Sequence, residues 1–268
     1  MLVELIGPAG IGKTTAARRA KQILEDMGVD VLGFDQLERL ESEIGIRSLN
    51  GRSWLARGRI IAGLLARRPD ITLSILLLSW LYGREESTGL RRGRRRRTRR
   101  VLGHLRMALT LRKTAADRVV LLDEGFTQVL WTLLIDSPSL RAKWLIRIVL
   151  RRYHQTIGQR GVRFIVDDEQ VVQRVFARNT RGRFNRDSSD QQRRDFPRWL
   201  DYFRKIVDML PAEFAVTTID GSSRAEAVAT ELVQAVLSIL PATDRPAGDP
   251  VGDADRRVNA SGNSKMVA

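Results

Sequence analysis

Short apolar runs divide the chain into predicted strands. They cover Leu2–Ile6, Val29–Phe34, Val119–Leu122, Val162–Val166 and Phe214–Ile219. Runs this short and this apolar are typical of buried strands in a parallel sheet. Because helix-like segments separate them, the sequence predicts an α/β fold with a parallel sheet of about five strands flanked by helices.

Apolar residues at helical spacing predict that the segments between these strands are helices. A helix from Ala16 to Met27 follows the first strand, and residues 36–113 are expected to be helical, with no convincing strand. Ser223 and Glu226 match a capping box for the last helix. Residues 1–242 therefore form one predicted domain, followed by a tail over 243–268 whose polar, glycine- and proline-rich composition predicts disorder.

The first strand leads into a glycine-rich loop with the Walker A pattern G-x-x-x-x-G-K-T, followed directly by a helix. This order of strand, loop and helix aims backbone N–H groups and the positive end of the helix dipole at phosphates. Lys13 is expected to neutralise the β- and γ-phosphates of ATP, and the Thr14 hydroxyl to bind Mg²⁺. The predicted ATP-binding residues are Gly7, Pro8, Ala9, Gly10, Ile11, Gly12, Lys13, Thr14 and Thr15.

The third strand ends in two acidic residues, Asp123 and Glu124. A buried strand that delivers a carboxylate to a metal is the Walker B arrangement, and a Walker A loop in the same chain strengthens this interpretation. Asp123 is expected to hold Mg²⁺ together with Thr14, and Glu124 to orient or deprotonate the attacking group.

Asp35 follows the second strand. In a doubly wound sheet this position lies in the crevice at the carboxyl ends of the strands, where ligands bind. The alternative is that Asp35 only caps the next helix.

A third cluster of candidate residues follows the helix that begins at Glu169. Arg178, Arg181, Arg183 and Arg186 surround a glycine-containing loop. Their spacing predicts a lid over residues 178–193 that closes on phosphates and stabilises charge on the transferring group. The alternative is a basic loop that faces solvent.

Composition restricts the function classes further. The 268 residues contain no cysteine and two histidines, which excludes disulfides and disfavours a zinc site. No apolar run reaches the roughly 18 residues of a membrane span, and the N-terminus predicts a strand rather than a signal peptide. We therefore expect a cytoplasmic protein.

The net charge of +15 comes mainly from arginine, with 40 of the 46 basic residues. Arginine binds phosphates bidentately, although a GC-rich genome would also enrich it. The run from Arg91 to Arg100 predicts a mobile, solvated loop beside the phosphate crevice, because like charges repel. Such a block can also dock nucleic acid or an acidic membrane, but it has no interleaved aromatic residue for base stacking.

Over residues 1–240, the succession GPAGIGKTT, LLDEGF, RVFARNTRGRF and FAVTTIDGSS resembles P-loop kinases of the thymidylate-kinase-like group, which phosphorylate nucleotides and nucleosides. That family usually has Asp-Arg-Tyr or Asp-Arg-Phe where this chain has Asp123, Glu124, Gly125 and Phe126. The acid is shared, whereas the arginine that serves the acceptor is not. In related deoxynucleoside kinases a carboxylate at the position of Asp35 is the general base.

The resemblance implies a kinase that uses ATP and Mg²⁺, catalysed by Lys13, Asp123, Glu124, Asp35 and the lid arginines. It places the acceptor, a nucleotide, nucleoside or similar small molecule, under residues 36–113, with Arg57, Arg59 or Arg84 available to an acceptor phosphate. Two alternatives remain. One is an NTP-dependent switch or nucleic-acid-associated ATPase anchored by residues 91–100, and the other is a kinase of a non-nucleotide small molecule. A homodimer is possible.

Overall fold

The strands of the computed structural model form one parallel sheet. The structure describes residues 1–33, 36, 54–82, 88–115, 117–135, 142–177, 190–212, 214 and 216–240. The strands are β1 (Leu2–Ile6), β2 (Val31–Leu32), β3 (Val119–Leu122), β4 (Arg160–Ile165) and β5 (Val216–Asp220). Their order is β2-β3-β1-β4-β5, and every pair is parallel. The predicted α/β fold is confirmed.

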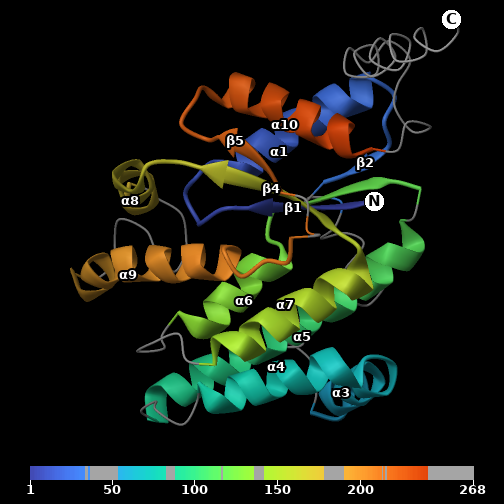
Figure 1. Cartoon of the computed structure of the whole chain (residues 1–268), viewed down its shortest axis with the longest axis vertical. Helices are drawn as coiled ribbons and strands as arrows, with labels where there is room; N and C mark the ends of the chain where they lie inside the picture. Colours follow the sequence, from blue (N-terminus) through green and yellow to red (C-terminus); the bar gives the residue numbers. More distant parts are fainter. Residues whose placement is uncertain are drawn as a thin grey trace, which may run out of the picture.

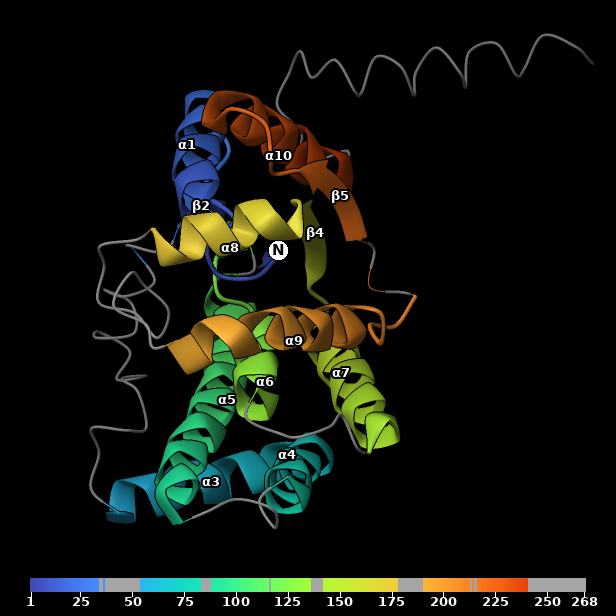
Figure 2. The ribbon, with the colours of Figure 1, turned by 90° about the vertical axis from the view of Figure 1, so that its left-hand side faces the viewer.

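Helices cover both faces of this sheet (Figures 1 and 2). On one side lie α1 and α10; on the other lie α5, α6, α7 and α9, with α3 and α4 in a further layer beyond them. The helices are α1 (Lys13–Asp26), α3 (Trp54–Arg67), α4 (Pro69–Leu81), α5 (Thr88–Thr114), α6 (Phe126–Leu134), α7 (Lys143–Ile157), α8 (Asp168–Phe176), α9 (Asp190–Val207) and α10 (Ala225–Ile239).

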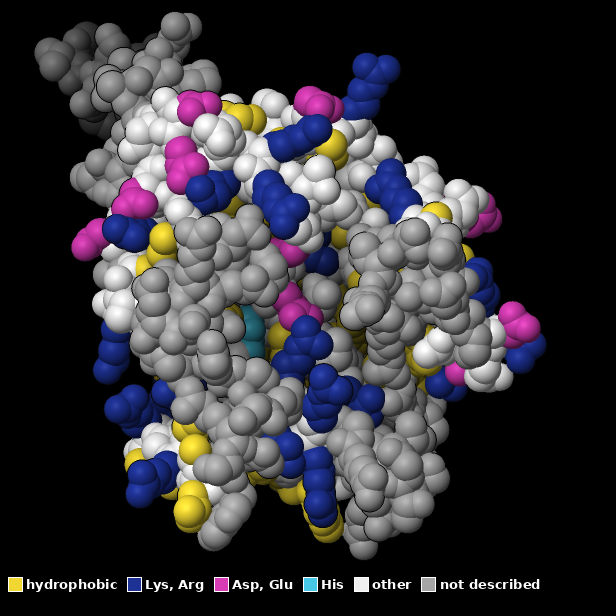
Figure 3. Space-filling model, turned by 180° about the vertical axis from the view of Figure 1, so that it is seen from behind, with side chains coloured by type: hydrophobic (Ala, Val, Ile, Leu, Met, Phe, Trp, Pro, Cys, Tyr) yellow, Lys and Arg dark blue, Asp and Glu magenta, His cyan; other side chains and the backbone are white. Residues whose placement is uncertain are grey.

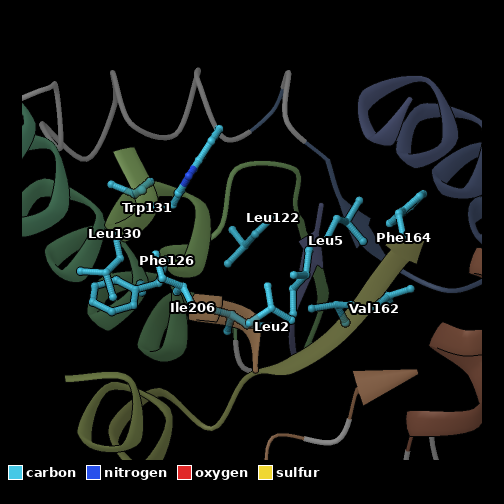
Figure 4. Packing of buried hydrophobic residues seen from close by; sticks show 14 of the residues in the cluster. Leu2, Leu5, Leu122, Phe126, Leu130, Trp131, Val162, Phe164 and Ile206 are labelled. Carbon is cyan, nitrogen blue, oxygen red and sulfur yellow. The ribbon is translucent and has the colours of Figure 1, made fainter. Parts of the chain in front are cut away.

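The central strand β1 is buried along its whole length. It pairs with β3 on one side, with Val3 opposite Leu121, and with β4 on the other, with Leu5 opposite Val162. Large side chains from α6 and α9 belong to one cluster with side chains of these strands (Figure 4). Since its neighbours fix β1 on both edges and both faces, the loop that follows it starts from a rigid support.

The prediction of a loop over the arginine run is wrong, because residues 91–100 belong to helix α5. Arginine has a high helix propensity, and exposed like charges are screened by water and salt. The helix is also anchored by packing: Val101, Leu102 and Leu105 are buried, and the hydroxyl of Thr98 lies 2.6 Å from that of Ser79 on α4. This packing outweighs the repulsion that predicted a loop.

Helix α9 begins at Asp190, so residues 190–193 of the predicted lid are helical, and the lid itself stays a prediction. One further prediction is wrong. The capping box does not form, because α10 begins after Arg224 without a side-chain cap and Glu226 instead pairs with Arg19 of α1. Residues 178–189 and the predicted tail lie outside the described residues.

Candidate active site

The glycine loop between β1 and α1 has a backbone that only glycine adopts readily. Gly10 and Gly12 have φ angles of 96° and 98°. A Cβ atom on Gly10 would also lie 2.3 Å from a methyl group of Val175 on α8. Gly12 is the N-cap of α1, where no side chain caps the helix and no acidic residue occupies the first turn. The first N–H groups of α1 are thus suited to an anion.

Lys13 lies beneath this loop with only 5% of its surface exposed. Its ammonium group donates to the carbonyl oxygens of Gly7 at 2.6 Å and Pro8 at 3.0 Å. The backbone at the start of the loop therefore holds the cation in place, next to the N–H groups at the start of α1.

Thr14 and Asp123 lie in contact although they are 109 residues apart. The Thr14 hydroxyl donates to Oδ2 of Asp123 at 2.5 Å. The pairing of β1 with β3, with Glu4 opposite Leu122, produces this contact because both strands then end at the same edge of the sheet. One hydroxyl and one carboxylate suit Mg²⁺, which commonly takes its remaining ligands from phosphate and water. Among the described residues, no group of three or more His, Cys, Asp or Glu side chains could form a complete protein cage.

Glu124 forms an ion pair with Arg100 of α5. Helix α5 packs along α6, and α6 begins two residues after Glu124, which brings the two side chains together. The end of the arginine run thus reaches the strand end that carries Asp123. The sequence indicated a basic segment near the phosphate crevice, but not which arginine approaches it.

These residues enclose a cavity of about 210 Å³. Its wall combines the loop from Ala9 to Thr14 with Asp123, Glu124 and Gln128. Backbone N–H groups, one ammonium group and two carboxylates therefore face a single space. A polyphosphate with a divalent cation matches this combination of charges.

A second cavity of about 310 Å³ also borders the glycine loop. It is lined by Gly10, Gly12 and Thr15 together with Arg174 of α8 and Ser223, which lies just before α10. The Arg174 guanidinium donates to the Gly221 carbonyl at 3.1 Å, which ties α8 to the loop after β5.

No sequence pattern assigned Arg174, Gly221 or Ser223 to a site. The available signal was the position of Gly221 directly after the last strand. A Cβ atom there would lie 2.8 Å from a methyl group of Val166, so the chain approaches β4 too closely for a larger residue.

The buried carboxyl group of Glu4 contacts the turn that follows β3. Glu4 of β1 accepts a hydrogen bond from the backbone N–H of Thr127 at 2.8 Å and another from the Gln159 amide. Burial raises the pKa of Glu4 to about 7, although both hydrogen bonds and Lys13 oppose the rise. The Glu4 side chain also packs against Gly125 so closely that a Cβ atom on Gly125 would lie only 2.0 Å from the Glu4 Cγ atom. Glu4 thereby positions the turn that carries Asp123 and Glu124.

Four of the catalytic candidates, Asp35, Arg178, Arg181 and Arg183, lie outside the described residues. Of the arginines considered for an acceptor phosphate, Arg59 is exposed on α3, whereas Arg84 and the side chain of Arg57 are outside the description. The structure thus brings together Lys13, Thr14, Asp123 and Glu124.

No protein-family model matches the sequence, and no curated protein matches it. Among solved structures, the chain is similar to a shikimate kinase from Acinetobacter baumannii in complex with shikimate. The two share 16% identity at a TM-score of 0.40, over 88% of this chain and 93% of that chain. The assignment to the P-loop NTPase fold rests on the chain's own features: a parallel sheet with β1 at its centre and the glycine loop between β1 and α1.

Proposed function

We propose that the protein is an ATP- and Mg²⁺-dependent kinase that transfers the γ-phosphate of ATP to a small molecule. The observation that carries this proposal is the convergence of Lys13, Thr14 and Asp123 on one cavity at the N-terminus of α1. Phosphoryl transfer depends mainly on positioning and on neutralising charge, and these residue types supply both.

Each residue has a distinct role in this proposal. The N–H groups of the loop and the first turn of α1 bind the phosphates, and the Lys13 ammonium group neutralises the β- and γ-oxygens. Thr14 and Asp123 would hold Mg²⁺, which offsets charge on the transferring group. Glu124 accepts a proton from the acceptor or orients it, and its ion pair with Arg100 holds it in place. Arg178, Arg181 and Arg183 would close over the phosphates.

We place the nucleoside part of ATP in the larger cavity beside Arg174. This cavity shares the glycine loop with the smaller one, so one molecule can bind along both. Its volume lies at the lower end of the usual range for small-molecule sites. The planar Arg174 guanidinium, held by the Gly221 carbonyl, is able to stack on a base.

The acceptor in this proposal is a nucleotide or nucleoside, as in the thymidylate-kinase-like group. A second candidate is a non-nucleotide small molecule, favoured by Glu124, which stands where that group has its acceptor arginine. Here the positive charge comes instead from Arg100 on α5. The residues that would face the acceptor thus differ from those of the thymidylate-kinase-like group. Asp35 stays a candidate general base.

The test is ATP turnover by the purified protein against a panel of nucleosides, nucleoside monophosphates, sugars and nucleic acids. Lys13→Ala is the inactive control, and Lys205→Ala removes a lysine that is exposed on α9 and should leave turnover unchanged. The proposal predicts one acceptor class that raises turnover and yields a phosphorylated product. Stimulation by nucleic acid alone, with no phosphorylated acceptor, would instead support the switch hypothesis.

A further inference from the structure

Helix α4 is apolar on two opposite sides. Its inward side carries Ile71, Ile75 and Leu78, which are fully buried. Its outward side carries Leu73, Leu77 and Trp80, with 55%, 42% and 56% of their surfaces exposed. Positions 73, 77 and 80 are separated by four and three residues, so the three side chains form one stripe along the helix. We call these three residues the apolar stripe.

Helix α4, which carries the apolar stripe, lies at the end of the molecule farthest from α1 and α10 (Figures 1 and 2). Helix α4 packs against α3, α5 and α7 there. Two of these neighbours add large apolar side chains that are more than half exposed, Leu55 on α3 and Trp144 on α7. Grouped exposed apolar residues on a soluble domain commonly mark an interaction surface.

The helices around the apolar stripe are strongly basic. The sequences of α3, α4, α5 and α7 contain eighteen lysines and arginines and a single acidic residue, Asp70. Several of these basic side chains are exposed at described positions, namely Arg59, Arg67, Arg95, Arg96, Arg147 and Arg151. Seen from behind, the coloured side chains at the lower end of the molecule, which belong to described residues, include many in dark blue and yellow (Figure 3).

This combination discriminates among possible partners. A second copy of the chain would bring two positively charged surfaces together, which opposes association. A nucleic acid backbone would match the arginines, but it offers nothing to the leucines of the stripe. An anionic lipid surface matches both, because its headgroups attract arginine while leucine and tryptophan enter the boundary between headgroups and acyl chains.

We propose that the surface formed by the apolar stripe and the surrounding arginines docks the protein on an anionic membrane. No helix in the described part of the chain is long and apolar enough to cross a membrane. The contact would therefore be peripheral, with Leu73, Leu77 and Trp80 inserted shallowly. The sheet lies in a separate layer from the helices that make the contact (Figure 1).

The test is flotation of the full chain with phosphatidylcholine vesicles that contain or lack phosphatidylserine. We expect binding only to the vesicles with phosphatidylserine and a loss of binding as salt is raised. The double substitution Leu73→Gln and Trp80→Gln should weaken binding roughly tenfold or more, since it removes apolar contacts but no charge. Arg147→Gln with Arg151→Gln should also weaken it, whereas Arg18→Gln, on α1 at the other end, should not.

Three results would overturn the proposal. The first is absence of binding to either kind of vesicle. The second is binding that the Leu73 and Trp80 substitutions leave unchanged, since charge alone would then suffice. The third is association with another partner instead of vesicles, either as a dimer that the same substitutions convert to a monomer or as tight binding to nucleic acid. Thermal unfolding of each variant shows whether these exposed changes leave the fold intact.

Discussion

Glu4→Gln is expected to stabilise the protein at alkaline pH. In the folded protein the pKa of Glu4 is raised from the usual 4.5 to about 7, mainly by burial. The folded state therefore binds the Glu4 proton more tightly than the unfolded chain does. Below pH 4.5 the carboxyl group is protonated in both states and has no effect on stability. Stability is lost as the pH rises from 4.5 to 7, because ionisation then costs more in the folded state.

The size of this loss follows from the pKa values. Each pKa unit corresponds to about 1.4 kcal/mol, so burying the ionised carboxylate costs about 3 kcal/mol above pH 7. Glutamine keeps the shape and can still accept the hydrogen bond from Thr127. The Gln159 amide, whose nitrogen donates to Glu4, must then turn over, so that its oxygen, a buried atom with no partner in the described structure, accepts from the new N–H group. The variant should therefore gain up to about 3 kcal/mol at pH 8 and almost nothing at pH 4.

The assay is urea unfolding of both proteins from pH 4 to pH 8.5, followed by tryptophan fluorescence. The difference between them isolates Glu4, because the other titrating groups are common to both. Glu169→Gln is the matched control, since it removes the same charge from an exposed position on α8. A difference that stays flat with pH, or a variant less stable than the parent at pH 8, would refute the argument that burial dominates at Glu4.

Five further substitutions test the geometry of the site. Gly125→Ala should destabilise the fold by about 1–3 kcal/mol in urea unfolding, because the new Cβ overlaps the Glu4 side chain; Glu4→Ala should relieve that cost. Gly10→Ala should lower ATP affinity roughly tenfold or more in calorimetry, since the loop needs a φ of 96° there. Asp123→Asn should remove the Mg²⁺-dependent gain in ATP affinity. Arg174→Ala should weaken ATP binding but leave tripolyphosphate binding unchanged, because Arg174 lines the larger cavity.

The sheet and the nucleotide loop could be predicted from the sequence because both depend on local patterns. Short apolar runs predicted every strand, and the residue spacing from Gly7 to Thr14 predicted the nucleotide-binding loop. The adjacency of Thr14 and Asp123 also followed, since parallel strands in one sheet end at the same edge.

The sequence was less informative where distant packing decides the structure. Repulsion within residues 91–100 predicted a loop, whereas contacts of Thr98 and Val101 with other helices stabilise α5. Glu4 lies inside the apolar run of the first strand, and only the approach of Thr127 and Gln159 shows its part in positioning the turn after β3. Arg174 reaches its cavity because α8 and the loop after β5 fold together, which no local pattern indicated.

In the proposed reaction, the residues around the smaller cavity, Lys13, Thr14 and Asp123, support transfer of phosphate from ATP to a small molecule. The most direct test is to follow the terminal phosphate of γ-labelled ATP, with Mg²⁺ and a pooled set of small hydroxylated acceptors. We expect label in an organic product, and no such product with Lys13→Ala or Asp123→Asn. Label found only in inorganic phosphate, or a product that forms equally with both variants, would contradict it.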